Sequence, residues 1–374
     1  MRRSLSLLVV PLSLSGLFSA PATAAGTENT TPGTRDATSQ QGQAESRALS
    51  EKTSSTAAQT REYWTPERMR EALANPMDPP VASPDVGRSQ KPKSPDGDAG
   101  NGGDSGDSGK DKRARLSAHA VPPRSVRADS PEEGVSTLAQ PRSDFVKYPS
   151  SWPNTATGKL FFKTPQGGKV CSASVIVSDT KNAVWTAAHC LHGGKDSGFY
   201  TDFKFVPAYA KRDAPWGEWY ADRVIVPQAW SEEADLRTDD MGALVMKKHP
   251  TYGTLQASVG AYGYDFGDTD HSDVSVLGYP VDGYRRPTSD FADGRRMMSC
   301  QGDTSDASNW NPLDDRLGID CDMGHGSSGG PFLDGVDDGD IQIVGTHSHR
   351  AGGLEVYSAE HGDRAEAVID LVNN

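Results

Sequence analysis

From about Phe145 to the C-terminus, short runs of aromatic and β-branched residues alternate with turns rich in Gly, Asp, Asn and Ser. Runs of this length between turn residues are typical of β-strands. The first two runs are joined by a Ser-Asp-Thr-Lys-Asn turn at 178–182. Many short strands with glycine-rich turns favour an all-β sandwich or barrel. The expected strands are Cys171–Val177, Val184–Ala188, Val224–Val226, Gly242–Met246, Val274–Leu277 and Ile341–Thr346.

The C-terminal end has a helical pattern instead. The apolar side chains within 368–372 form a stripe at helical spacing. Asp363 and Glu366 fit the N-cap and N3 positions that would begin such a helix. We therefore expect a short C-terminal helix after the strands.

The N-terminal end has the pattern of a secretory signal peptide. Arg2 and Arg3 precede an apolar stretch at 5–18, and Ala-Thr-Ala at 22–24 provides small residues for cleavage. A membrane anchor is disfavoured, because a spanning helix needs roughly 20 apolar residues. No later stretch of the sequence is apolar enough to span a bilayer. The sequence thus predicts a signal peptide at 1–24 and a secreted mature protein.

Residues 25–145 have the composition of a low-complexity pro-region or linker. They are rich in Ser, Gly, Pro, Asp, Gln and Lys, and cannot bury enough apolar surface to offset ordering. One short helix is expected there, with Thr65 as N-cap, Pro66 at N1 and the helical residues at 68–74. We expect this largely disordered region to be cut within 110–115, after Glu133 or after Arg142. A flexible extension without a regulatory role is the alternative.

The formal net charge of −13 argues against two classes of partner. Nucleic acids and anionic membrane surfaces both attract cationic proteins. The acidity is typical of a soluble surface on an exported protein. We expect no nucleic-acid partner and no membrane partner.

Four cysteines are present, at 171, 190, 300 and 321. An even number in an exported chain favours disulfides, and four cysteines allow three pairings. A zinc site is the alternative, but the sequence contains no C-x-x-C pair. His325, His347 and His349 could bind a metal, although no acidic residue or cysteine joins them at metal-ligand spacing. We expect no metal and no other cofactor.

Three motifs carry chemistry, and each supplies one part of a nucleophilic mechanism. They are Gly-Ser-Ser-Gly-Gly-Pro at 326–331, Thr-Ala-Ala-His-Cys at 186–190 and Asp-Asp-Met-Gly-Ala-Leu at 239–244. A serine hydroxyl is a weak nucleophile until an adjacent base takes its proton, and histidine does this near neutral pH. A buried carboxylate then fixes the imidazole tautomer and stabilises the imidazolium.

These motifs resemble the triad motifs of the chymotrypsin-like serine peptidases, and in particular the bacterial secreted branch that includes the glutamyl endopeptidases. The resemblance covers roughly residues 146–374, which form the expected peptidase domain. It implies a fold of two packed six-stranded β-barrels. It also implies a secreted serine endopeptidase that hydrolyses protein or peptide substrates through an acyl-enzyme, and we expect it to be a monomer.

The resemblance assigns the site residue by residue. Ser328 resembles the nucleophile, His189 the general base and acid, and Asp240 the orienting carboxylate, with Asp239 as the competing position. The backbone N–H groups of Gly326 and Ser328 resemble an oxyanion hole. It further implies disulfides Cys171–Cys190 and, with that pair formed, Cys300–Cys321.

Ser327 departs from the family pattern. Animal digestive members have an aspartate at this position, which pairs with a new N-terminal amine after activation. Ser327 cannot make that ion pair. We therefore expect an oxyanion hole that forms without an inserted N-terminus, and any regulation by the pro-region to work by another route.

Two other function classes were weighed. An α/β-hydrolase elbow needs acid and histidine after the serine, but only 46 residues follow Ser328, and Gly-Gly-Pro is a poor helix start. A catalytically inactive binding module on the same fold is disfavoured, because all three triad positions are intact.

Primary specificity depends on two positions that favour opposite substrates. Asp322 lies where trypsin-like enzymes hold the carboxylate that binds Lys or Arg. His347 lies where glutamyl endopeptidases hold the histidine that binds an acidic side chain, and Arg350 could add positive charge. The sequence favours Glu before the cleaved bond over Lys or Arg, with a small neutral residue as a third option. The substrate-binding candidates are His347, Ser348, Asp322, His325 and Arg350.

Overall fold

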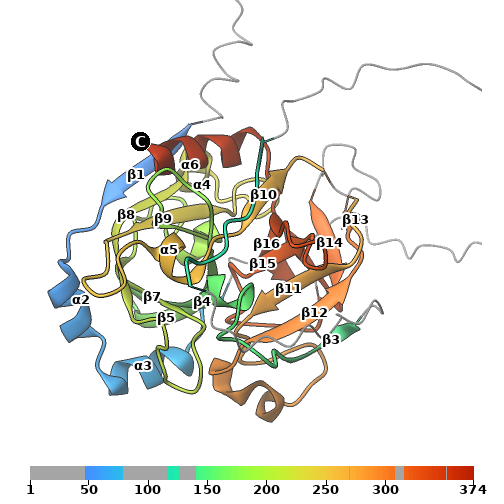
Figure 1. Cartoon of the computed structure of the whole chain (residues 1–374), viewed down its shortest axis with the longest axis horizontal. Helices are drawn as coiled ribbons and strands as arrows, with labels where there is room; N and C mark the ends of the chain where they lie inside the picture. The colour runs from blue at the N-terminus through green and yellow to red at the C-terminus, as the bar shows by residue number, and fades with distance from the viewer. Residues whose placement is uncertain (1–46, 79–115, 126–139, 269, 308–315, 351) are drawn as a thin grey trace, which may run out of the picture.

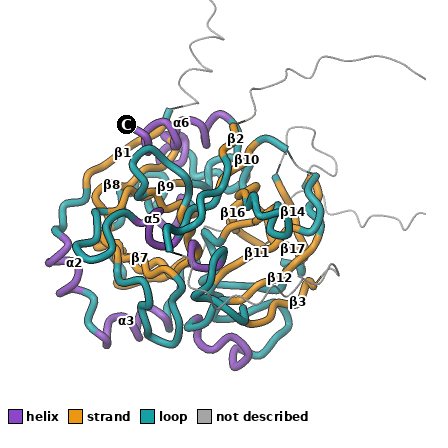
Figure 2. The backbone as a smooth tube through the Cα atoms, in the orientation of Figure 1, coloured by secondary structure: helices purple, strands orange, loops and turns teal. Residues whose placement is uncertain are grey.

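The computed structural model describes residues 47–78, 116–125, 140–268, 270–307, 316–350 and 352–374. Two β-sheets lie side by side, with the helices around their outside (Figure 1, Figure 2). The expected all-β chymotrypsin-like fold is confirmed. The predicted signal peptide and the expected cuts within 110–115 and after Glu133 lie outside the described residues.

The first sheet contains a closed six-stranded barrel. Strand β9 pairs with both β6 and β8, which closes the order β8-β7-β4-β5-β6-β9 into a ring. The strands expected at 171–177, 184–188, 224–226 and 242–246 all fall in this barrel, but only the last has the expected bounds. The first and third begin several residues earlier than expected, and the second ends at Thr186. The barrel strands are β4 Thr157–Thr164, β5 Gly167–Val175, β6 Ala183–Thr186, β7 Thr201–Pro207, β8 Trp219–Pro227 and β9 Gly242–Met246.

The second sheet curls into a half-barrel. Its order is β13-β14-β17-β16-β15-β11-β12-β3, and β2 and β10 join it through β16. The seam between β12 and β14 has no strand pairing among the described residues, but the Cys300–Cys321 disulfide spans it. This seam is therefore closed by a covalent cross-link. The strands are β2 Leu116–Ala118, β3 Gln140–Phe145, β10 Gly263–Phe266, β11 Val274–Gly278, β12 Met298–Gly302, β13 Ser305–Asp306, β14 Leu317–Asp320, β15 Pro331–Asp334, β16 Gln342–Arg350 and β17 Glu355–Ser358.

The core follows from strand alternation and from full burial of several strands. Every residue of β6 and β9 is buried, as expected for strands covered on both faces.

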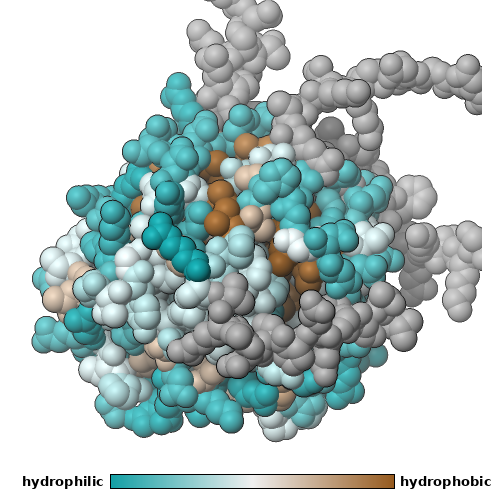
Figure 3. All heavy atoms as spheres, in the orientation of Figure 1, coloured by the Kyte–Doolittle hydropathy of each residue, from teal (hydrophilic) through white to brown (hydrophobic). Residues whose placement is uncertain are grey.

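The face drawn in Figure 3 is largely hydrophilic, with hydrophobic residues confined to small patches. The remaining short elements are α4 Gln228–Glu232, α5 Leu255–Val259, η1 Asn154–Ala156, η2 Ala188–Cys190 and η3 Thr288–Gly294. Each helix within the described ranges is too short or too polar to span a bilayer.

An ordered segment precedes the peptidase strands. It contains β1 Ala48–Lys52, α2 Ala57–Tyr63 and α3 Pro66–Leu73, and runs along the outside of the first barrel (Figure 1). β1 pairs antiparallel with β8, which adds a seventh strand to the first sheet. The predicted short helix is confirmed as α3, with the Thr65 side chain accepting from the N–H of Arg68. The two sheets thus include residues before the expected domain boundary at 146.

Trp64 anchors this segment. Its side chain is 4% exposed and packs edge-on against Phe161, with ring centroids 5.6 Å apart. The indole N–H donates to the Asp202 carbonyl at 2.6 Å. An ideal β-carbon on Gly168 would lie only 3.1 Å from the indole, so a side chain there would crowd Trp64. The segment is therefore joined to the same core as the barrel.

The C-terminal helix α6, Asp363–Asn373, lies across β8, β9 and β1. Its existence is confirmed, but the expected N-cap is wrong. Gly362 occupies the N-cap, and Asp363 and Glu366 both lie in the first turn. Their carboxylates still favour the helix, because the N-terminal end of the helix dipole is positive.

Candidate active site

His189 and Asp240 meet between two elements of the first barrel. His189 lies on η2, directly after β6, and Asp240 directly precedes β9, which pairs with β6. The ring Nδ1 is 2.8 Å from Asp240 Oδ2, and the His189 backbone N–H donates to Oδ1 at 2.9 Å. Two contacts to one carboxylate fix the orientation of the imidazole. Within the described structure, the buried Nε2 of His189 has no hydrogen-bond partner.

The environment of Asp240 keeps this carboxylate ionised. Burial alone would raise its pKa, but the His189 charge and hydrogen bonds from His189 and Ser348 outweigh burial and hold the pKa below its ordinary value. The Ser348 hydroxyl donates to Oδ2, the oxygen that also contacts the imidazole. Ser348, named above as a substrate-binding candidate, therefore contacts the carboxylate that orients His189.

Asp239 points elsewhere. Its carboxylate contacts Arg364 of α6 and the Thr238 hydroxyl. Burial raises the pKa of Asp239 to about 6 despite Arg364. The structure thus brings Asp240, and not its neighbour, to His189.

Ser328 lies on a loop packed against the first barrel. Its carbonyl accepts from the Ser172 N–H at 2.7 Å, and Ser172 follows Cys171 on β5. The Cys171–Cys190 disulfide then links this strand to the residue after His189. Gly329, at φ +80°, allows the approach, since an ideal β-carbon there would lie 1.9 Å from Thr186 Oγ1. The loop and the His189 turn are thereby held against the same strands.

The Gly326 N–H is oriented by the peptide bond that contains it. The His325 carbonyl accepts from the Val281 N–H at 2.8 Å. In a trans peptide the N–H and C=O point in opposite directions, so the Gly326 N–H points away from Val281. Neither it nor the Ser328 N–H donates to an acceptor in the described part of the chain. Two backbone donors of one loop are therefore available for an oxyanion.

His347 is buried behind this loop. Its backbone N–H donates to Gly330, and its carbonyl accepts from Gly329. The side chain is 3% exposed, and its Nε2 lies 3.5 Å from the Ser327 hydroxyl. Nδ1 has no partner among the residues that the structure describes. Burial lowers the pKa of His347 to about 3, so the free imidazole is neutral.

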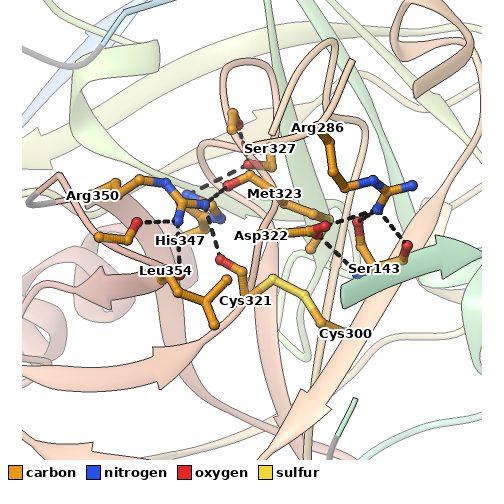
Figure 4. Close-up of a disulfide and its surroundings, with 12 residues drawn as sticks. Ser143, Arg286, Cys300, Cys321, Asp322, Met323, Ser327, His347, Arg350 and Leu354 are labelled. Atoms are coloured by element: carbon orange, nitrogen blue, oxygen red, sulfur yellow. Dashed lines mark hydrogen bonds and ion pairs between the residues drawn. A yellow bond between two sulfur atoms is a disulfide. The ribbon is translucent and has the colours of Figure 1, made fainter. Parts of the chain in front are cut away.

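Asp322 is already paired inside the protein (Figure 4). One carboxylate oxygen lies 2.8 Å from the Arg286 guanidinium, and the other accepts from the Ser143 N–H at 2.8 Å. The side chain is almost fully buried. A carboxylate with both oxygens occupied has little capacity to bind a substrate cation as well.

Arg350 lies close to the Asp322 loop, but its guanidinium binds backbone carbonyls (Figure 4). Its guanidinium donates to the carbonyls of Gly353, Leu354, Cys321 and Met323. These four contacts use most of the hydrogen-bond donors of Arg350. Its positive charge remains beside the loop 321–323.

His325 is a half-exposed residue directly before Gly326. Its Nδ1 is 2.7 Å from Asp282, and its Nε2 is 3.2 Å from Asp78, at the end of the ordered N-terminal segment. The hydrogen bond to Asp282 raises the pKa of His325, which favours the imidazolium. Met77 donates its backbone N–H to Val170 of β5 at 3.1 Å. The N-terminal segment thus reaches the residue before Gly326.

The histidines once considered as metal ligands do not converge. The described residues contain one group of His, Cys or acidic side chains dense enough for a metal, Cys171, His189 and Cys190. There the two sulfurs are bonded to each other. His349 contacts Ser348 and Arg316 instead of His325 or His347.

Several residues that build the site lie outside the sequence motifs. Ser172, Asp282 and Arg286 belong to no catalytic motif, yet each contacts a site residue. Ser172 could have been noticed because it follows Cys171. Asp282 and Arg286 gave no signal, since their partners lie about 40 residues away along the chain.

Comparisons with solved structures agree with this fold. No protein-family model and no curated protein sequence matches the chain. Two solved structures match with a TM-score of 0.51: the protease Anisep from Arthrobacter nicotinovorans, at 28% identity, and the thermostable serine protease AL20 from an extremophilic microorganism, at 29%. The matches cover 58% and 59% of this chain, and 95% and 97% of the other chains. A Glu endopeptidase in complex with MPD matches at 15% identity and TM-score 0.49, over 62% of this chain and 96% of that one.

The fold and these similarities define the class of the chain. It is a serine peptidase of chymotrypsin-like fold, and so a serine-type hydrolase. Within that class it resembles bacterial proteases.

Proposed function

We propose that the protein is a secreted serine endopeptidase with His189, Asp240 and Ser328 as its catalytic triad. One observation carries the proposal: a buried imidazole whose Nδ1 is held by an ionised carboxylate while its Nε2 has no partner in the described structure. This is the arrangement that a general base needs toward a serine hydroxyl.

In the proposed mechanism, Ser328 Oγ attacks the substrate carbonyl and His189 Nε2 takes its proton. Asp240 stabilises the resulting imidazolium through Nδ1. The Gly326 and Ser328 N–H groups donate to the carbonyl oxygen as it becomes negative. The imidazolium then gives its proton to the leaving amine, which leaves an acyl-enzyme. Water activated by His189 hydrolyses the acyl-enzyme and restores Ser328.

A preference for Glu before the cleaved bond is the specificity that the site supports best. His347 has a buried nitrogen without a described partner, which a substrate carboxylate could engage. A carboxylate beside it would raise its pKa and favour a protonated donor. The Arg350 charge would also attract a substrate carboxylate, although by itself it lowers the pKa of His347. The trypsin-like alternative is weaker, because Arg286 neutralises Asp322.

The segment 47–78 is proposed as the ordered part of a pro-region. The Asp78–His325 contact and the Met77–Val170 hydrogen bond support it, because they hold the end of the segment against β5 and the residue before Gly326. Export through the residue 1–24 leader remains part of the proposal, and the two disulfides are compatible with an oxidising compartment.

The triad is tested with Ser328→Ala in the full chain, expressed with export and assayed on fluorogenic peptides. We expect activity to fall by at least three orders of magnitude, because triad members act as a unit. A serine-directed phosphonate should label the wild type at Ser328 and leave the variant unlabelled. Substantial activity in Ser328→Ala would contradict the proposal.

Specificity is tested with matched peptides that differ only in Glu, Gln, Lys or Ala before the cleaved bond. We expect Glu to be cleaved about 10-fold or more faster than Gln, and the ratio to approach one in His347→Ala. The matched control is His119→Ala, which removes an exposed histidine far from His347 in the sequence. Faster cleavage after Lys, abolished by Asp322→Asn, would favour the trypsin-like alternative.

A further inference from the structure

Lys159 is a fully buried cation that the mechanism above does not use. It lies near the start of β4, and its side chain is completely inaccessible to solvent. No carboxylate within the described ranges forms an ion pair with its Nζ. An unpaired buried ammonium is costly, so a lysine at this position needs an explanation beyond stability.

The Lys159 ammonium lies directly beneath the loop that precedes Ser328. Nζ donates to the Tyr279 carbonyl at 2.9 Å and lies 5.5 Å from the centre of the Tyr279 ring. An ideal β-carbon on Gly326 would be 3.5 Å from Nζ, and one on Gly294 would be 3.0 Å away. Both residues are glycines with positive φ, +88° and +64°, so the chain leaves room for the ammonium there.

Tyr279 begins a short stretch, 279–282, that binds the Gly326 loop along its length. The Val281 N–H donates to the His325 carbonyl, and the Asp282 carbonyl accepts from the Gly324 N–H at 2.9 Å. The Asp282 carboxylate accepts from the His325 N–H at 2.8 Å. Because the Val281 contact orients the peptide between His325 and Gly326, the position of stretch 279–282 decides where the Gly326 N–H points.

Ser172 ties Lys159 to the same assembly from the neighbouring strand. Lys159 and Ser172 are directly paired across β4 and β5. The Ser172 hydroxyl donates to the Gly326 carbonyl at 2.9 Å and accepts from the Tyr279 N–H at 2.9 Å. Lys159 and Ser172 thus bind the two backbone polar groups of Tyr279, its C=O and its N–H, beside the loop.

We infer that Lys159 is a positioning residue for the oxyanion hole, which it shapes through Tyr279 and supports with a positive charge beneath Gly326. The inference rests on the proposed function of Ser328.

The charge of Lys159 fits this role. Burial lowers its pKa to about 7, so the ammonium and the neutral amine are close in free energy near neutral pH. A negative charge that develops on the substrate above Gly326 favours the ammonium, since opposite charges raise the pKa of a cationic group. The stabilisation is therefore greater in the transition state than in the ground state, which is the condition for raising kcat.

The test compares Lys159→Met, which keeps length and removes charge, with Lys163→Met, an exposed lysine of the same strand. We expect Lys159→Met to lower kcat by about 10- to 100-fold, since loss of a direct oxyanion donor costs roughly 10²–10³-fold. KM should change less than about threefold, because ground-state binding is not affected. A peptide boronate, which forms a tetrahedral adduct on the serine, should lose affinity in parallel with kcat. Lys163→Met should behave as wild type.

Thermal unfolding separates this role from a structural one. Because replacing a buried cation with an apolar chain removes a desolvation penalty, we expect Lys159→Met to be as stable as wild type or more stable. If it does not fold, Lys159→Gln serves, since it keeps a donor for Tyr279 without the charge, and the same loss of kcat is expected. Unchanged kcat in a folded Lys159→Met or Lys159→Gln would overturn the inference. Failure of the proposed function itself would appear separately, as full activity in Ser328→Ala.

Discussion

Trp64 determines how firmly the N-terminal segment is held on the barrel, and Trp64→Ala tests this. The indole is almost fully buried, packs on Phe161 and donates one hydrogen bond to Asp202. Replacing a buried Trp with Ala costs about 3–5 kcal/mol. At 1.4 kcal/mol for each factor of ten, the docking equilibrium of segment 47–78 should weaken by roughly two to nearly four orders of magnitude.

Amide hydrogen exchange in the intact chain measures this change directly. We expect the amides of α3 and β1 to lose protection by a comparable factor, while those of β6 and β9 keep most of theirs. Glu62→Ala, an exposed position two residues away, is the matched control and should exchange as the wild type does. If exchange in α3 and β1 is the same in Trp64→Ala as in the control, Trp64 does not anchor the segment.

Three further perturbations follow from single contacts. Ser348→Ala removes a hydrogen bond to the buried Asp240 carboxylate, worth about 1.5–3 kcal/mol, so kcat should fall roughly 10- to 100-fold; steady-state kinetics with unchanged kcat would contradict this role. Replacing both Cys300 and Cys321 with Ala opens the seam between β12 and β14 and should lower the free energy of unfolding in urea by about 2–5 kcal/mol, whereas an unchanged midpoint would show that the seam is held by packing. Burial lowers the pKa of His361 to about 4, below the ordinary value near 6.5, so the stability that depends on neutral His361 is complete above pH 6.5 and falls by about 3 kcal/mol as the pH drops toward 4. In urea titrations, His361→Gln should lose less stability than the wild type over this pH range, and an equal loss in both proteins would disprove this role.

The motifs around the proposed triad are recognisable in the sequence because their chemistry is local. Residues 186–190 and 326–331 each combine a reactive side chain with the small residues that its close packing requires, and Gly329 against Thr186 shows why. The short strands were predictable for a similar reason, since alternation and turn residues act within a few positions.

Lys159 shows what local patterns do not reveal. Lys159 and Lys163 lie on the same strand with even spacing, and alternation alone gives them the same environment. One is fully buried and the other exposed, because the loop before Ser328 and stretch 279–282 cover only one end of the strand. That cover comes from residues more than 100 positions away, which no window of sequence contains.

The N-terminal segment was only partly predictable, for a different reason. The capping residues of α3 predicted the helix. The composition of residues 25–145 indicated that this region cannot form a hydrophobic core by itself. That remains true of the segment by itself. The segment is ordered by the barrel, because β1 pairs with β8 and Trp64 packs against Phe161.

The way in which segment 47–78 is attached has a consequence for maturation. It joins the barrel through strand pairing and side-chain packing, whereas residues 79–115 connect it along the backbone. A single cut within 79–115 would therefore yield a heterodimer of two polypeptides, held together without any covalent link. Such a product would show two N-terminal sequences and one native mass, and its smaller chain would dissociate on dilution. Activation would then depend on protein concentration as well as on cleavage.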